Sequence, residues 1–133
     1  MLFEMQRTTV AGRPALTVRG ELDLAAAPQL AAAVEAQLAA GPRALVLDLT
    51  PTIFMDSSGA RELVRLARRA AAAGVPLHVV APRSNTAVRL TIDLLELGTV
   101  VPIVESAADI PSGSGSASGG GTASRSTEQQ ARP

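Results

Sequence analysis

The chain has 133 residues, which is enough for one compact domain with its own core. Apolar residues make up 47% of the sequence, but Phe3 and Phe54 are the only aromatic ones, so we expect an aliphatic core. Twelve Arg balance twelve acidic residues, and the sequence contains neither Lys nor Cys. The balanced charge argues against a surface for nucleic acid or an anionic membrane, and the lack of Cys excludes disulfides and thiolate chemistry. Because no segment has the character of a signal peptide or a membrane span, we expect a cytoplasmic protein.

The first forty residues predict a hairpin followed by a helix. Leu2–Thr8 and Ala15–Arg19 have the short alternating pattern of strands, and the turn between them contains Ala11-Gly12-Arg13-Pro14. A helix should begin near Ala26 and end at Gly41-Pro42. Its buried side is predicted from apolar residues that recur every fourth position, namely Leu30, Val34 and Leu38.

The middle of the chain predicts a buried strand, a long loop and a second helix. Ala44–Leu49 is apolar nearly throughout, as is typical of a central strand. The loop ends at Asp56, and a helix from about Ser58 to Ala73 follows, with Gly74 as its C-terminal cap. The predicted apolar face of this helix consists of Ala60, Leu63, Val64, Ala67 and Ala71.

The remaining elements complete an α/β domain with a mixed sheet. Leu77–Val80 is another buried strand, Ser84 or Asn85 can cap a third helix that ends near Leu94, and Val100–Val104 is a last short strand. The order predicts an antiparallel hairpin followed by parallel strands joined by crossover helices. Ser106–Ile110 can form a short terminal helix, and residues 111–133, rich in Ser and Gly, should be disordered.

The stretch Thr50–Gly59 (TPTIFMDSSG) is the most informative part of the sequence. It leaves the carboxyl end of a strand, which is the usual ligand side of such a sheet, and reaches a helix N-terminus, where a phosphate is favourable. Ser57 and Ser58 beside Asp56 are therefore candidate acceptors for a protein kinase. The alternative is that the two serines only cap the helix. A serine hydrolase is disfavoured because the single His, His78, lies in an apolar strand and no Gly-x-Ser-x-Gly turn is present.

Three segments together resemble the STAS domain family, which includes bacterial anti-sigma factor antagonists. Gly20-Glu21-Leu22-Asp23 resembles the family signature after the second strand, Asp48-Leu49-Thr50 resembles its strand end, and Phe54–Gly59 resembles its phosphorylation loop. The resemblance covers residues 1–110 and implies a single STAS-like domain with a mixed sheet, an N-terminal hairpin and crossover helices. The sequence departs from the usual pattern at Pro51, Ala60, Arg61 and Glu96, the last of which stands where Gly is common.

The resemblance implies a regulator of transcription rather than an enzyme. Ser57 would accept phosphate from an anti-sigma factor that is itself a serine kinase, and a PP2C-type phosphatase would reset it. The unphosphorylated chain would bind the anti-sigma factor and so free the sigma factor, and the phosphorylated chain would release the anti-sigma factor. An alternative with the same fold is an unphosphorylated scaffold subunit of a lipid transport or signalling assembly. The residues that the resemblance places on the partner surface are Asp23, Asp56, Ser58 and Gly59.

Other polar residues have simpler interpretations. Asp23 is as readily a carboxylate at a helix start, and Asp48 is interpreted as a hydrogen-bonded structural carboxylate. His78 is expected to be a hydrogen-bonded core or edge residue without a metal role, and no cofactor motif is present. The basic residues of the second helix are interpreted as a solvated face, and they are Arg61, Arg65, Arg68 and Arg69.

Overall fold

The computed structural model describes residues 2–111, in which six strands form one mixed sheet. β1 (Phe3–Val10) and β2 (Arg13–Leu22) form the predicted antiparallel hairpin, with Phe3 opposite Gly20. The strands are longer than predicted because the turn contains only Ala11 and Gly12, whose φ angles of 52° and 75° allow a two-residue connection. Arg13 and Pro14 therefore belong to β2 and not to the turn.

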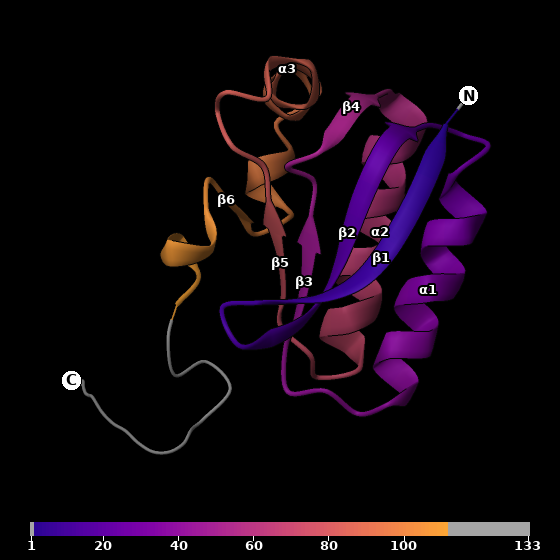
Figure 1. Cartoon of the computed structure of the whole chain (residues 1–133), viewed down its shortest axis with the longest axis vertical. Coiled ribbons are helices and arrows are strands. Elements are labelled where there is room, and N and C mark those ends of the chain that lie inside the picture. Colours follow the sequence, from indigo (N-terminus) through magenta and orange to yellow (C-terminus); the bar gives the residue numbers. More distant parts are fainter. Residues whose placement is uncertain (1, 112–133) are drawn as a thin grey trace.

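The rest of the sheet is parallel, as predicted. β3 (Leu45–Asp48) lies between β2 and β5 (Leu77–Val80), and β6 (Ile103–Val104) pairs with the outer edge of β5. The strand order is β1-β2-β3-β5-β6, so the hairpin forms one side of the sheet and the short β6 the other (Figure 1). The predicted α/β class and mixed sheet are confirmed, although β6 covers only two of the five residues expected for it.

A sixth strand was not predicted from the sequence. β4 (Thr52–Met55) lies within the stretch interpreted as a loop, and that interpretation is wrong. β4 pairs in parallel with the end of β2, beyond the point where β3 stops, and a register shift between Gly20 and Glu21 accommodates it. The Thr52 hydroxyl donates a 2.7 Å hydrogen bond to the Val18 carbonyl, which fastens the start of β4 to β2.

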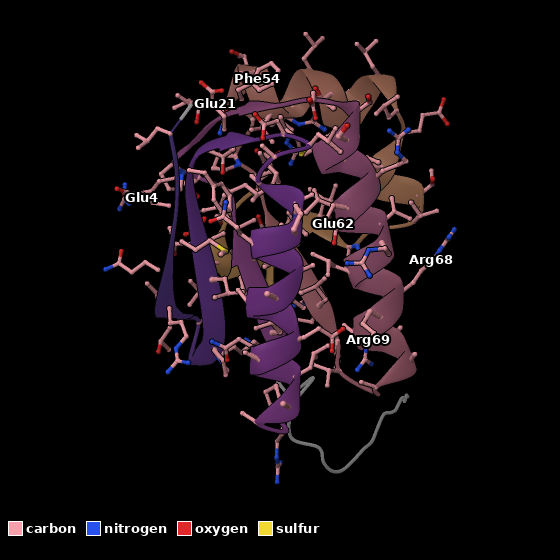
Figure 2. The ribbon with its side chains drawn as sticks, turned by 90° about the vertical axis from the view of Figure 1, so that its right-hand side faces the viewer. Glu4, Glu21, Phe54, Glu62, Arg68 and Arg69 are labelled. Atoms are coloured by element: carbon pink, nitrogen blue, oxygen red, sulfur yellow. The ribbon has the colours of Figure 1, made fainter. Side chains whose placement is uncertain are left out.

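Two helices cover one face of the sheet (Figures 1 and 2). α1 (Ala27–Ala39) buries Leu30, Val34 and Leu38 as predicted. α2 (Ser57–Ala72) has a buried face that differs from the prediction, because Ala71 is exposed whereas Leu66 and Ala70 are fully buried. The observed set follows the i, i+3, i+4, i+7 pattern of a helix stripe, and it consists of Gly59, Ala60, Leu63, Leu66, Ala67 and Ala70.

The third helix lies at one end of the sheet beside β4 (Figure 1). α3 (Thr86–Leu94) begins after Asn85, which is one of the two predicted caps. Its buried side chains include Val88 and Ile92. Two 3₁₀ turns follow, at Leu97–Thr99 and Ala107–Asp109, so the helix predicted at the end of the domain is a single turn.

The other face of the sheet has a smaller apolar cluster. Ala15, Val46 and Val80 are covered there by Ile110, which is 5% exposed. The tail expected to be disordered begins at residue 111, and its residues 112–133 lie outside the described part of the chain. Within residues 2–111, none of the helices has both the length and the apolar character needed to cross a membrane.

Candidate functional site at the start of helix α2

Asp56, and not a serine, caps helix α2. Its backbone is extended, with φ of −99° and ψ of −173°, and its carboxylate accepts a 2.9 Å hydrogen bond from the Gly59 N–H. Ser57 is the first residue of the helix and is exposed, and its hydroxyl makes no hydrogen bond within residues 2–111. Ser58 is half-buried. The interpretation of the two serines as caps is therefore wrong, because the Asp56 carboxylate accepts the hydrogen bond from the helix N–H that a capping serine would accept.

Gly59 holds the start of α2 against the end of β2. A Cβ atom at this position would lie 2.3 Å from the Leu22 carbonyl oxygen, so any larger residue would push the helix away from the strand. Leu22 is opposite Met55 in the β2–β4 pair, and Asp56 follows Met55 directly. Gly59 thus allows α2 to pack closely against β2, and this packing sets the position of Ser57 on the surface.

Asp23 lies in the loop that follows Leu22 and precedes α1. Its carboxylate accepts a 3.0 Å hydrogen bond from the Ala26 N–H, which agrees with its interpretation as a carboxylate at a helix start. The side chain is half-buried. Because β2 pairs with β4 up to Leu22 and Met55, this loop begins beside the strand end that carries Asp56. Its role toward a partner stays a prediction.

A group of exposed apolar side chains lies at the same end of the molecule, and sequence analysis missed it. These residues come from the loop before α1, from β4 and from α3, and Figure 1 shows these elements at the same end of the molecule as the start of α2. We call the group the apolar rim, and its members, which are 44–73% exposed, are Leu24, Ile53, Phe54, Leu90 and Leu94. Large apolar side chains gathered in this way mark interaction surfaces. The four-residue spacing of Leu90 and Leu94, offset from the buried Val88 and Ile92, is the sequence signal that could have revealed the helix part.

Hydrogen bonds hold the rim elements together. The Thr91 hydroxyl on α3 donates a 2.7 Å hydrogen bond to the Met55 carbonyl of β4. The Asn85 side-chain amide donates to the carbonyls of Thr52 at 2.7 Å and Leu49 at 3.1 Å, and its oxygen accepts from the Val88 N–H at 3.3 Å. The loop between β3 and β4 and the end of β4 are therefore tied to α3.

The remaining candidates have structural roles. Asp48 accepts hydrogen bonds from the Thr50 N–H at 3.0 Å and from the Thr50 hydroxyl at 2.6 Å, as its interpretation required. Arg65 pairs with Glu62, and Arg69 pairs with Glu35 at 2.8 Å across the two helices. Arg65, Arg69 and Glu35 are exposed and Glu62 is half-buried, so solvent screens both pairs and they contribute little to stability.

His78 departs from the expectation of a hydrogen-bonded residue. Its Nδ1 atom is buried and has no hydrogen-bond partner in the described part of the chain. Burial, with a smaller contribution from Arg13, lowers the pKa of His78 below its usual value, so the imidazole is neutral near pH 7. His78 lies on β5 and not beside Ser57. Among residues 2–111, no group of three or more His, Cys, Asp or Glu side chains could hold a metal ion.

The fold and the motif together decide the family. The sequence model of the STAS domain matches residues 4–110, which is most of the chain. The chain belongs to the STAS domain family. A comparison with curated protein sequences found no significant match.

Several solved structures resemble this chain over most of its length. An anti-sigma factor antagonist from Mycobacterium paratuberculosis is 28% identical, with a TM-score of 0.66 over 81% of this chain and 90% of that one. The protein TM1081 has a TM-score of 0.65 at 19% identity, over 82% of this chain and 85% of that one. The anti-sigma factor antagonist SpoIIAA in its unphosphorylated form has a TM-score of 0.54 at 19% identity, over 79% of this chain and 89% of that one. The last two likenesses show the fold alone.

Proposed function

We propose that this STAS domain is an anti-sigma factor antagonist that is switched by phosphorylation of Ser57. The observation that carries the proposal is the exposed Ser57 hydroxyl at the first position of α2, beside a carboxylate that already caps the helix. Such a hydroxyl has no structural task, so a kinase can modify it without breaking the fold. The 28% identity to an anti-sigma factor antagonist supports the same class of function.

The apolar rim supplies the binding surface in this proposal. An unphosphorylated Ser57 is small and neutral, so a partner can cover it together with Phe54, Leu90 and Leu94 and gain the burial of their exposed area. Asp23, Asp56 and Ser58 lie at or near this surface and would provide its polar contacts. Gly59 would contribute indirectly, because it sets the position of the helix start. The partner is an anti-sigma factor with serine kinase activity.

Phosphorylation would act on the interface and not on the fold. A phosphoserine carries roughly −1.5 to −2 charges, which the partner would have to desolvate next to the Asp56 carboxylate. The first N–H groups of α2 and its positive dipole end stabilise the same phosphate within the domain. The modified chain therefore stays folded and releases its partner, and a PP2C-type phosphatase restores the binding form.

An enzymatic role for Ser57 lacks support from its surroundings. A nucleophilic serine needs a base within hydrogen-bond reach, and the only histidine is on β5, while Asp56 is engaged with the Gly59 N–H. A serine-directed acylating probe is expected to leave Ser57 unlabelled.

Phosphate transfer to Ser57 is the direct test. The chain is used to capture its partner from the native cell, and the purified partner is incubated with the chain and ATP. Intact-mass and peptide mass spectrometry should show one phosphate on Ser57. Ser58→Ala is the comparison variant, because it removes the neighbouring hydroxyl but keeps the proposed acceptor, so the phosphate should still be found on Ser57. An unmodified chain, or a phosphate that persists in Ser57→Ala, would overturn the proposal.

A second experiment separates the switch from the scaffold alternative. Ser57→Asp places a negative charge where the phosphate would be, so a switched domain should lose its partner while Ser57→Ala keeps it. A constitutive scaffold subunit would keep its partner in both variants. Circular dichroism and thermal unfolding of the two variants should match the parent chain, because Ser57 makes no hydrogen bond in the described structure.

A further inference from the structure

A groove lies at the opposite end of α2 from Ser57. It is bounded by the last turns of α2, the loop leading into β5 and the segment before β6, and its volume is about 450 Å³. This volume falls in the range of about 300–1,000 Å³ that is usual for small-molecule sites. The side chains that line it are mainly apolar, and they include Ala67, Ala71, Val75, Leu77, Val100 and Pro102.

The groove exists because α2 carries only small side chains on this side. Ala67 and Ala71 are one turn apart, so two methyl groups stand where longer side chains would fill the space. On the opposite wall, Val100 is 49% exposed although it is a large apolar residue. Val75 and Leu77 are buried, so the accessible apolar surface of the groove is formed by its exposed residues, which include Ala71, Val100 and Pro102.

Arg68 is the one charged residue that lines the groove. Its neighbours are engaged, since Arg65 pairs with Glu62 and Arg69 pairs with Glu35. Arg68 is exposed and has no ion pair within residues 2–111. Figure 2 shows it on the outer side of α2, away from α1. The groove thus combines an apolar wall with an unpaired guanidinium at its edge.

We propose that this groove binds an aliphatic carboxylate. The alkyl chain would lie on the exposed Ala71, Val100 and Pro102, and the carboxylate would accept two parallel hydrogen bonds from the Arg68 guanidinium, whose planar fork matches its geometry. The positive charge of Arg68 disfavours a cationic amphiphile, and a neutral one gains no ion pair with the guanidinium. The site is separate from the proposed phosphorylation switch, because sixteen residues of helix separate the ends of α2.

Octanoate is a suitable probe, and its binding can be followed by nitrogen-15 amide shifts of the full chain. Saturable shifts should cluster at Val75, Leu77 and Val100, and octanol should bind about three- to fivefold more weakly, since the ion pair with the exposed Arg68 is lost. Shifts scattered over the surface, shifts confined to another site, or equal affinity for octanol and octanoate would overturn the proposal.

Two substitutions test the two halves of the groove separately. Arg68→Gln removes the charge and should weaken octanoate binding about three- to fivefold while leaving octanol binding unchanged. Ala71→Leu fills the groove with a larger side chain, and because Leu is a good helix former the helix should be kept. This variant should bind neither octanoate nor octanol. Arg61→Gln is the matched control, because it lies two turns earlier on the same side of α2 and should change the affinity less than about twofold. Octanoate binding that survives Ala71→Leu in a chain with a native amide spectrum would contradict the assignment.

Discussion

Helices α2 and α3 begin in the same way but carry different surroundings. Both follow a loop or strand end, and both are capped by an Asp or Asn side chain that accepts from the N–H three residues later. The Asn85 amide also donates to the carbonyls of Leu49 and Thr52, whereas the Asp56 carboxylate has no donor to offer. The cap of α3 therefore locks a loop, and the cap of α2 leaves an exposed hydroxyl at the helix start. The hydrogen bond from the cap oxygen to the helix N–H is the same in both helices. The two caps differ in the remaining group of the side chain, which is an N–H donor in Asn85 and a second carboxylate oxygen in Asp56.

The largest effect is expected from replacing the amide of Asn85 by a carboxylate. Asn85→Asp keeps the acceptor for the Val88 N–H, but it removes the donor and turns a negative oxygen toward the carbonyls of Leu49 and Thr52. We expect a loss of about 3 kcal/mol in the free energy of unfolding, measured by urea denaturation at pH 7. A loss below about 1 kcal/mol would show that these hydrogen bonds do not hold the β3–β4 loop.

Gly59→Ala should be the next most damaging change. Its Cβ would meet the Leu22 carbonyl oxygen, a backbone atom that cannot turn aside, so α2 would have to shift. We expect a loss of about 2 kcal/mol in the free energy of unfolding, after the better helix propensity of Ala is included. Ser58→Ala in the same turn is the control and should cost far less. Equal stability of the two variants would mean that the contact between α2 and β2 is not tight.

The sequence could predict most of the fold but only part of the site. Periodic apolar residues identified α1, and the Asp56-Ser57 junction and its family resemblance identified the candidate acceptor. β4 could not be predicted, because Ile53 and Phe54 are both exposed and its four residues lack alternation, so it is a strand only through its pairing with β2. The apolar rim was missed for the same reason, since the exposure of Leu90 and Leu94 depends on what packs against α3.

The carboxyl ends of the two helices differ in a way that a pair of substitutions can test. Gly74 after α2 and Glu96 after α3 both have left-handed backbones, with φ of 76° and 52°. Glycine adopts this conformation without a steric cost, whereas a residue with a Cβ adopts it at a cost of roughly 1–2 kcal/mol. Glu96→Gly should therefore raise the free energy of unfolding by about 1 kcal/mol, and Gly74→Ala should lower it by a similar amount. If thermal unfolding shows no change in either variant, or changes of the opposite sign, then Gly74 and Glu96 do not share the left-handed conformation.

The smallest effect is expected from the reciprocal exchange at α2. Asp56→Asn keeps the acceptor for the Gly59 N–H, and Asn is as good a cap as Asp, so only the favourable charge at the helix start is lost. We expect a decrease of about 0.5 kcal/mol in the free energy of unfolding, against about 3 kcal/mol for Asn85→Asp. Similar losses in the two variants would show that the caps are equivalent and that the comparison between the helices fails. If the losses differ as expected, the Asp56→Asn variant stays folded. Its ability to capture the proposed anti-sigma factor then measures what the carboxylate charge beside Ser57 contributes to binding.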